Sequence, residues 1–314
     1  MARYVYGPVP SRRLGSSLGV DLVPHKTCTF DCLYCQLGPT EKTTTERAEY
    51  TPVDDVVEEV RGRLQELNQP PDYVTLGGSG EPTLHASFGE IARRIKVFTD
   101  VPICLLSNGS LFSLPEVRQA CKWIDLTVPS LDAPDPETYQ RVNRPNASIR
   151  FSDIVSGLEA LRREFDGEIW LEVFLLRGIN DSDEHVARFR ELIDRIHPDR
   201  VQLNTAIRPP AEESARAVSA DRLGEVREVL GQRAEVIASP EDRPTSEEEG
   251  VDEERVLEML RRRPCTVDDI SSGLGVHRHA VIKSLRRLSD QQKVSSTREG
   301  GKLYYRAETD RAES

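Results

Sequence analysis

The sequence predicts an α/β protein with a parallel sheet, followed by a small domain of three helices and a β-hairpin. Up to about residue 238, β-branched runs alternate with amphipathic helical patterns about six times, which is typical of parallel βαβ units. Residues 239–250, SPEDRPTSEEEG, are polar, contain prolines and lack apolar periodicity, as in a linker. We therefore expect one domain over residues 1–238, a linker over 239–250, a second domain over 251–306 and a tail over 307–314.

The strand candidates of the first domain are short apolar runs rich in β-branched residues. They lie at 17–23, 72–78, 101–107, 123–131, 169–176 and 200–207. Helical patterns separate them and lie at 52–68, 86–98, 114–122, 151–165, 183–195 and 219–232. This alternation leaves open a full or partial barrel or an open doubly wound sheet. In each of these architectures, ligands gather at the carboxyl ends of the strands.

The second domain has the element order of a winged helix-turn-helix. The pattern predicts helices at 252–262, 267–273 and 277–290, then two strands around EGGK at 299–302. Residues 251–306 hold 12 Lys and Arg against 8 Asp and Glu. The third helix carries its basic residues outside an apolar stripe, and these are Arg278, Lys283, Arg286 and Arg287. Such a helix can enter a nucleic-acid groove, but the same fold also docks proteins, so either partner is open.

Composition and the absence of long apolar runs indicate where in the cell the protein acts. The chain has 314 residues and a net charge of -11, which does not suggest a protein that coats nucleic acid through its overall charge. No apolar run approaches the roughly 20 residues that a membrane-spanning helix needs. The beginning, MARYVYGPVPSRRLG, lacks the apolar stretch of a secretory signal. We expect a cytoplasmic protein that does not associate with a membrane.

Three of the six cysteines stand close together in KTCTFDCLYCQLG, directly after the first predicted strand. Their spacing is Cys28-x3-Cys32-x2-Cys35, and no second pair follows at a distance suited to a four-ligand zinc site. A cubane cluster has four irons and normally four thiolates, so three thiolates leave one iron open. An open coordination position is typical of a working site. The other thiols read as buried or incidental, and they are Cys104, Cys121 and Cys265.

The cysteine loop resembles the signature of the radical S-adenosylmethionine (SAM) superfamily. The CxxxCxxC spacing, with the aromatic Tyr34 before the last cysteine, is that signature. A second element, LGGSGEPTLH at 76–85, is similar to the family's glycine-rich motif at the end of the second strand. The resemblance implies that Cys28, Cys32 and Cys35 hold a [4Fe-4S] cluster. It also implies that the motif receives the methionine part of SAM; the residues expected to bind SAM here are Tyr34, Gly78, Ser79, Gly80 and Glu81.

The same resemblance implies further contacts at the ends of the next strands. Asn108, in LSNGS, ends the third predicted strand and is expected to bond SAM. Ser130 and Asp132, in VPSLDAP, match positions where the superfamily often contacts the ribose or the methionine carboxylate. Three other residues are implied to face the active site or substrate, and they are Arg144, Asn204 and Arg208.

The fold and chemistry follow from the resemblance, which covers residues 17 to about 208. It implies a partial (β/α)6 barrel of the TIM type. The open iron would chelate the amino and carboxylate groups of SAM. An electron from the reduced cluster would then give methionine and a 5′-deoxyadenosyl radical that takes a hydrogen from the substrate. The electron donor would be a protein such as ferredoxin or flavodoxin. The substrate is not identified.

A narrower resemblance concerns residues 6–38. It is to the branch related to wyosine-tRNA synthases, which build a tricyclic base from methylated guanosine. The matching residues are Gly7, Pro8, Ser11, Arg12 and Arg13. Those synthases carry extra cysteines ahead of the signature, whereas here no cysteine precedes Cys28. We therefore place the chain among relatives of that branch, with RNA modification open as its reaction.

A function from another class also fits the two domains. The chain could be an iron-sulfur-sensing transcription regulator whose second domain binds DNA and whose first domain catalyses nothing. The glycine-rich GGSGEP at 77–82 favours the enzyme, because a sensor has no need of a pocket for the methionine part of SAM.

Overall fold

The computed structural model describes residues 4–11, 13–207, 210–237, 252–274, 276 and 278–308. Its main feature is an eight-stranded sheet in which the strands follow their sequence order. All neighbouring pairs are parallel except the first, because β1 runs antiparallel to β2. The strands are β1 (Val5–Ser11), β2 (Gly15–Val20), β3 (Tyr73–Leu76), β4 (Ile103–Ser107), β5 (Leu126–Pro129), β6 (Glu168–Leu175), β7 (Arg200–Thr205) and β8 (Ala234–Val236).

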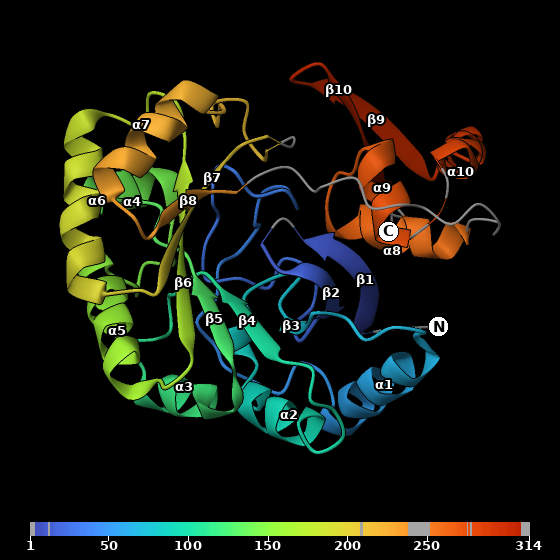
Figure 1. The fold of residues 1–314 in the computed structure, drawn as a ribbon, viewed down its shortest axis with the longest axis horizontal. Coiled ribbons are helices and arrows are strands. Elements are labelled where there is room, and N and C mark those ends of the chain that lie inside the picture. Colours follow the sequence, from blue (N-terminus) through green and yellow to red (C-terminus); the bar gives the residue numbers. More distant parts are fainter. Residues whose placement is uncertain are drawn as a thin grey trace.

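Helices connect the parallel strands and form an arc outside the sheet (Figure 1). This one-sided cover is that of a barrel-like sheet, since a doubly wound sheet has helices on both faces. The helices are α1 (Val53–Glu66), α2 (Phe88–Ile95), α3 (Pro115–Ala120), α4 (Pro136–Asn143), α5 (Phe151–Glu164), α6 (Asp183–Ile196) and α7 (Ala220–Leu230). Their inner faces pack on the sheet in one large apolar core, in which Phe88, Phe112 and Phe189 are fully buried.

The strand register brings three loops together. β2 pairs with β3 so that Val20 lies beside Leu76, and β3 pairs with β4 so that Leu76 lies beside Leu105. The carboxyl ends of these strands therefore meet at one edge of the sheet. The loops that follow them are the cysteine loop, the glycine-rich segment and LSNGS, so residues from three distant parts of the sequence become neighbours.

All six strands and six helices that the sequence predicts in this part are confirmed, with ends that differ by a few residues. Two strands and one α-helix were not predicted. β1 contains Pro8 and Pro10, which disfavour a central strand, and it lies at the edge of the sheet. β8 has only three residues. The short α4 begins with a proline after Asp135, whose carboxylate accepts a hydrogen bond from the Thr138 amide at 2.9 Å.

The C-terminal module, residues 252–308, has its own apolar core. It consists of α8 (Glu253–Arg262), α9 (Val267–Leu274), α10 (Arg278–Asp290), β9 (Val294–Glu299) and β10 (Lys302–Ala307). These are the helices and hairpin that the sequence predicts, and their core includes Val256, Leu260, Ile270, Val281 and Leu285. α8 and α9 pack beside β1 (Figure 1). The predicted linker, 239–250, lies outside the described residues, and the domain boundaries stay predictions.

No helix in the described ranges combines the length and the apolar character needed to cross a membrane.

Candidate functional site

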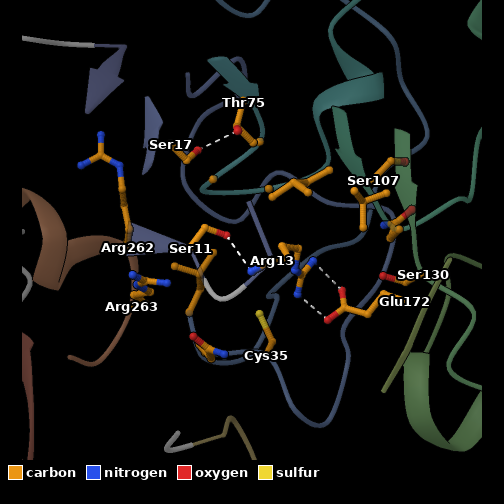
Figure 2. Close-up of a pocket in the computed structure, with 18 of the residues that line it drawn as sticks. Ser11, Arg13, Ser17, Cys35, Thr75, Ser107, Ser130, Glu172, Arg262 and Arg263 are labelled. Carbon is orange, nitrogen blue, oxygen red and sulfur yellow. Dashed lines mark hydrogen bonds and ion pairs between the residues drawn. The ribbon is translucent and has the colours of Figure 1, made fainter. Parts of the chain in front are cut away.

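A cavity of about 390 Å³ lies inside the sheet, between the loops at the carboxyl ends of the strands and the inner strand faces. Figure 2 shows its walls, with Cys35, Ser107, Ser130 and Glu172 around one part and Arg262 and Arg263 at one end. Of the eleven residues predicted from sequence to hold the cluster or SAM, eight line this cavity. They are Cys28, Tyr34, Cys35, Gly78, Gly80, Glu81, Asn108 and Ser130. The three that do not line it are Cys32, Ser79 and Asp132.

Each sulfur of the cysteine loop lies within reach of its own nitrogen donor. The Asn108 Nδ2 atom lies 3.5 Å from Cys28 Sγ, and the Asn143 Nδ2 atom lies 3.5 Å from Cys32 Sγ. The ammonium group of Lys26 donates to Cys35 Sγ at 3.1 Å. N–H groups aimed at sulfur suit a thiolate, which accepts hydrogen bonds, and such contacts tune the reduction potential of an iron-sulfur cluster.

Burial disfavours the charged form of these thiols when no metal is bound. It raises the pKa of Cys28 to about 12, with a further increase from the nearby Glu81 carboxylate. Burial also raises the pKa of Cys32 well above its ordinary value, helped by Asp132 and the neighbouring thiols. A thiolate here needs positive charge beside it, and bound iron supplies that charge.

The three sulfurs suit a cluster better than a single ion. Within the part of the chain that the structure describes, no three or more Cys, His, Asp or Glu side chains are grouped to hold one metal ion. A cubane bonds each cysteine to a different iron, so its thiolates need not meet at one point. Free thiols on one loop, a nitrogen donor for each sulfur and a cavity beside Cys28 and Cys35 together fit a [4Fe-4S] cluster.

The glycine-rich loop packs tightly against the protein itself. A Cβ atom on Gly78 would lie 2.0 Å from Asp21 Oδ1, and one on Gly80 would lie 2.2 Å from the Thr27 carbonyl oxygen. Glycine lets a ligand approach the backbone closely, which is one reason for glycines in such a loop. The structure adds a stronger reason, because a side chain at either position collides with protein atoms. Both residues still line the cavity.

Glu81 joins the loop after β3 to the end of β4. Only 1% of it is exposed, and its carboxylate accepts four hydrogen bonds. The donors are the Thr83 amide at 3.0 Å, the Thr83 hydroxyl at 2.5 Å, the Ser107 hydroxyl at 2.8 Å and the Asn108 amide at 2.7 Å. Burial raises the pKa of Glu81, and these donors oppose the increase. The carboxylate therefore orients this corner of the cavity.

Asp132 lies behind the cavity wall. Its carboxylate accepts hydrogen bonds from Asn143 Nδ2 at 2.9 Å, from the Phe174 amide at 3.1 Å and from the Tyr34 hydroxyl. Tyr34 stacks on Phe174 with ring centroids 3.9 Å apart, and both rings line the cavity. Burial raises the pKa of Asp132 to about 7. In this structure Asp132 positions Tyr34, while contact with SAM stays a prediction.

Arg13 and Glu172 form an ion pair inside the sheet that the sequence did not predict. Arg13 donates from Nη1 to Glu172 Oε2 at 3.0 Å and from Nη2 to Oε1 at 2.6 Å (Figure 2). Asn204, which the sequence placed near the substrate, also donates to Glu172 Oε1 at 2.7 Å. The signal for Glu172 was a lone carboxylate within the apolar strand IWLEVFLL. A charge at an inward position of a buried strand needs a partner, and Arg13 supplies it.

One of the two arginines that the resemblance placed near the active site lies outside the cavity. Arg144 does not line the cavity, and its side chain is 41% exposed. Its guanidinium pairs with Glu212 at 2.7 Å and with Asp31 at 3.7 Å, so in this structure Arg144 contacts these carboxylates rather than the cavity. Arg208 lies outside the described residues.

The C-terminal module supplies one wall of the cavity. Met259, Arg262 and Arg263, at the end of α8 and just beyond it, line the cavity together with the cysteine loop. These residues follow the cysteine loop by more than 220 positions, and nothing in their local sequence indicates this contact. The candidate site is thus built by both parts of the chain.

Comparisons with known proteins agree with this geometry. Residues 22–190 match the family model described as the Radical SAM superfamily. The chain is 39% identical over 304 residues to a Brachyspira hyodysenteriae protein named GTPase Obg, and it spans 45% of that protein's length. It is 32% identical to a UPF0026 protein of Helicobacter pylori strain J99, and the match covers 96% of each chain.

Two more distant proteins match smaller parts of the chain. A dual-specificity RNA methyltransferase RlmN of Nitratidesulfovibrio vulgaris is 24% identical over 199 residues, which is 59% of this chain and 51% of that protein. The crystal structure of a radical SAM methyltransferase from Sphaerobacter thermophilus superposes with a TM-score of 0.54 at 18% identity. That match covers 70% of this chain and 65% of the other, and it shows a common fold.

Proposed function

The chain belongs to the radical SAM superfamily and is a radical SAM enzyme of unspecified reaction; from this premise we propose how its residues hold the cofactors. Cys28, Cys32 and Cys35 bind a [4Fe-4S] cluster, and SAM occupies the neighbouring cavity. The single observation that carries this proposal is that Cys28 and Cys35 line the same cavity as the glycine-rich loop and Ser130.

The bound cofactors supply the chemistry. The chemistry that they would supply is the one-electron reductive cleavage of SAM, with methionine and a 5′-deoxyadenosyl radical as products and an unidentified molecule as the substrate of that radical. Gly78, Ser79, Gly80 and Glu81 form the loop proposed to hold the methionine part. The Glu81 carboxylate is fixed by the hydrogen bonds described above, and Gly78 and Gly80 pack against protein atoms, so little rearrangement is needed on binding.

The remaining residues position SAM from the other strands. Asn108 and Ser130 line the cavity beside the cysteine loop and have side chains that hydrogen-bond polar groups. Tyr34 and Phe174 give an apolar, stacked wall, and Asp132 holds Tyr34 in place. We propose that this wall excludes water from the reacting carbon. The partial (β/α)6 barrel, formed by β2–β7 and their helices, is the frame for these contacts.

We propose RNA modification as the reaction class. Three observations support it: the similarity to an enzyme named as an RNA methyltransferase, the N-terminal resemblance to the wyosine branch, and the basic α10. Lys283 and Arg286 are exposed on α10, while Arg278 and Arg287 pair with Asp268 and Glu253 of the same module. In this proposal residues 251–306 are a winged helix that presents α10 to RNA. Binding of DNA or of a protein, in place of RNA, would contradict this part of the proposal.

The cysteines also bear on the location of the protein and on its electron donor. We propose a cytoplasmic location and a donor such as ferredoxin or flavodoxin, because an open cluster and three further free thiols suit a reducing compartment. The non-catalytic regulator is not favoured, since family membership and the cavity beside the cysteines both support an enzyme. The name GTPase is not carried over, because the chain has no G-x-x-x-x-G-K-[ST] sequence.

The test is anaerobic reconstitution of the purified protein with iron and sulfide, followed by dithionite and SAM. We expect 5′-deoxyadenosine to form, and Cys32→Ala to abolish both the brown chromophore and this product. Cys121→Ala is the matched control, because that thiol is buried beside α3 and away from the site; it should keep both. Cleavage by the Cys32→Ala protein would show that the ligand assignment is wrong.

A further inference from the structure

We infer that Arg262 of the C-terminal module is a positioning residue for the SAM loop, so that SAM affinity depends on how the module is docked. This inference rests on the proposed function; the SAM loop is residues 77–81, which include the four residues proposed to hold the methionine part of SAM. It adds a role for a part of the chain that contributes no cluster ligand and lies far from the loop in sequence.

Arg262 is held from three directions. Its Nε donates to Asp21 Oδ2 at 3.0 Å, and the side chains of this pair are only 16% and 13% exposed. Its guanidinium lies 3.7 Å from the centroid of the Tyr6 ring, a cation–π contact. Its Nη1 donates to the Glu258 carbonyl oxygen at 2.8 Å, within its own helix. The group is therefore fixed at the seam between α8 and the sheet.

Both partners of Arg262 continue directly to the SAM loop. Asp21 uses its other oxygen, Oδ1, to accept the Ser79 amide at 2.7 Å. The Tyr6 hydroxyl donates to the Gly77 carbonyl oxygen at 2.9 Å. One arginine thus reaches the two loop residues on either side of Gly78, each through a single intervening side chain.

Gly78 shows how closely these groups fit. A Cβ atom there would lie 2.0 Å from Asp21 Oδ1 and 3.0 Å from the Tyr6 hydroxyl oxygen. The loop is therefore pressed against the two side chains that Arg262 holds. If Arg262 moves, Asp21 loses its counter-charge and Tyr6 loses the cation over its ring, and the loop backbone can shift with them.

The module is attached to the site at two further points. The Tyr304 hydroxyl on β10 donates to the Ile207 carbonyl oxygen beyond β7 at 2.7 Å. Arg306 donates to the Gln36 carbonyl oxygen in the cysteine loop at 2.6 Å. The module therefore contacts the cysteine loop directly and reaches the SAM loop through Tyr6 and Asp21. Any partner that changes its docking would also change the SAM loop, and the coupling would act in both directions.

The experiment uses the full chain with its cluster reconstituted and measures the Kd of SAM by equilibrium dialysis. Arg262→Met should weaken SAM binding about tenfold, the equivalent of one charge-assisted hydrogen bond. Iron and sulfide content should stay unchanged, since Arg262 contacts no cysteine. Arg262→Lys, which keeps the charge, should recover part of the affinity. The matched control is Arg261→Met, because Arg261 is exposed on the same helix and pairs with Glu254.

Two further measurements keep the inference falsifiable. Should Arg262→Met not fold, Asp21→Asn is used instead, because it removes the charge and keeps an oxygen for the Ser79 amide. In the unaltered protein, SAM should slow hydrogen exchange in α8, as reciprocal coupling requires. Equal SAM affinity in Arg262→Met, or in Asp21→Asn where that stands in, would overturn the inference. A wild-type protein that binds no SAM would instead overturn the proposed function.

Discussion

Arg13 and Glu172 form a two-pronged ion pair that crosses the inside of the sheet, with N–O distances of 3.0 and 2.6 Å. Arg13 follows β1 and Glu172 lies in the middle of β6, so the pair joins the N-terminal hairpin to a strand at the far side of the cavity. The two side chains are 16% and 12% exposed. Such a pair costs desolvation when it forms and costs more when one partner is left alone.

We predict that Arg13→Met lowers the free energy of unfolding by about 3 kcal/mol, because it leaves the Glu172 carboxylate buried without its counter-charge. Urea unfolding of the metal-free protein measures this. The double variant Arg13→Met with Glu172→Met should recover most of the loss, since no lone charge remains. If the double variant is as unstable as Arg13→Met alone, the unpaired charge of Glu172 is not the cause of the lost stability.

Lys26 should raise the reduction potential of the cluster, because its ammonium lies 3.1 Å from Cys35 Sγ and stabilises the extra negative charge of the reduced state. We expect Lys26→Met to shift the midpoint to more negative values by roughly 60 mV, about 1.4 kcal/mol for one electron. A redox titration followed by electron paramagnetic resonance gives the value. Lys42→Met is the control, because Lys42 is exposed on the segment after the cysteines. Equal shifts in both variants would refute a specific contact.

Glycines in the SAM loop should be intolerant of a methyl group. Gly80→Ala places a Cβ 2.2 Å from the Thr27 carbonyl oxygen, so the backbone must move. We expect a loss of about 1–3 kcal/mol of stability, typical of overpacking, and weaker SAM binding. The control is Gly62→Ala in α1, where a Cβ meets nothing within 4 Å. It should stabilise the protein by about 0.5–1 kcal/mol, and thermal unfolding compares the two. A Gly80→Ala protein as stable as the wild type would contradict the packing.

Asp132 gives the metal-free protein a pH-dependent stability. Burial raises its pKa to about 7, so between its ordinary value and 7 the folded state holds a proton that the unfolded chain has lost. Stability due to this group is therefore greatest below the ordinary pKa of an aspartate, falls as the pH rises to about 7 and levels off above that value, and roughly 2 kcal/mol of the loss lies between pH 5 and 8. Urea unfolding of Asp132→Asn should lack this component. An unchanged slope in that variant would place the titration elsewhere.

The regular part of the fold could be predicted because strand and helix periods are local properties of the sequence. The run DYVTLGG predicts β3, and the amphipathic segment at 52–68 predicts α1. β1 was not predicted because Pro8 and Pro10 disfavour a strand in the sequence pattern, although an edge strand tolerates them. The three cysteines could be found from spacing alone. This spacing does not reveal their nitrogen donors, of which Asn143 is 111 positions away from Cys32.

Contacts between segments that are far apart in the sequence could not be predicted from it. Glu172 was visible as a charge in an apolar strand, but its partner Arg13 lies 159 positions away. Arg262 meets Asp21 across 241 positions, and its helix has the ordinary pattern of an amphipathic surface helix. Asp132 is a further example, since the motif that contains it does not indicate its hydrogen bond with Tyr34, 98 positions away. Sequence motifs indicate which residues carry the chemistry, whereas the fold determines which other residues contact them.

The central claim is that three cysteines hold a cluster with one iron open to SAM. Electron paramagnetic resonance of the anaerobically reconstituted, dithionite-reduced protein, recorded with and without SAM, tests it most directly. We predict the signal of a reduced [4Fe-4S] cluster that changes when SAM is added and that disappears in Cys32→Ala. Zinc in place of iron, or a cluster signal that SAM leaves unaltered, would contradict the account.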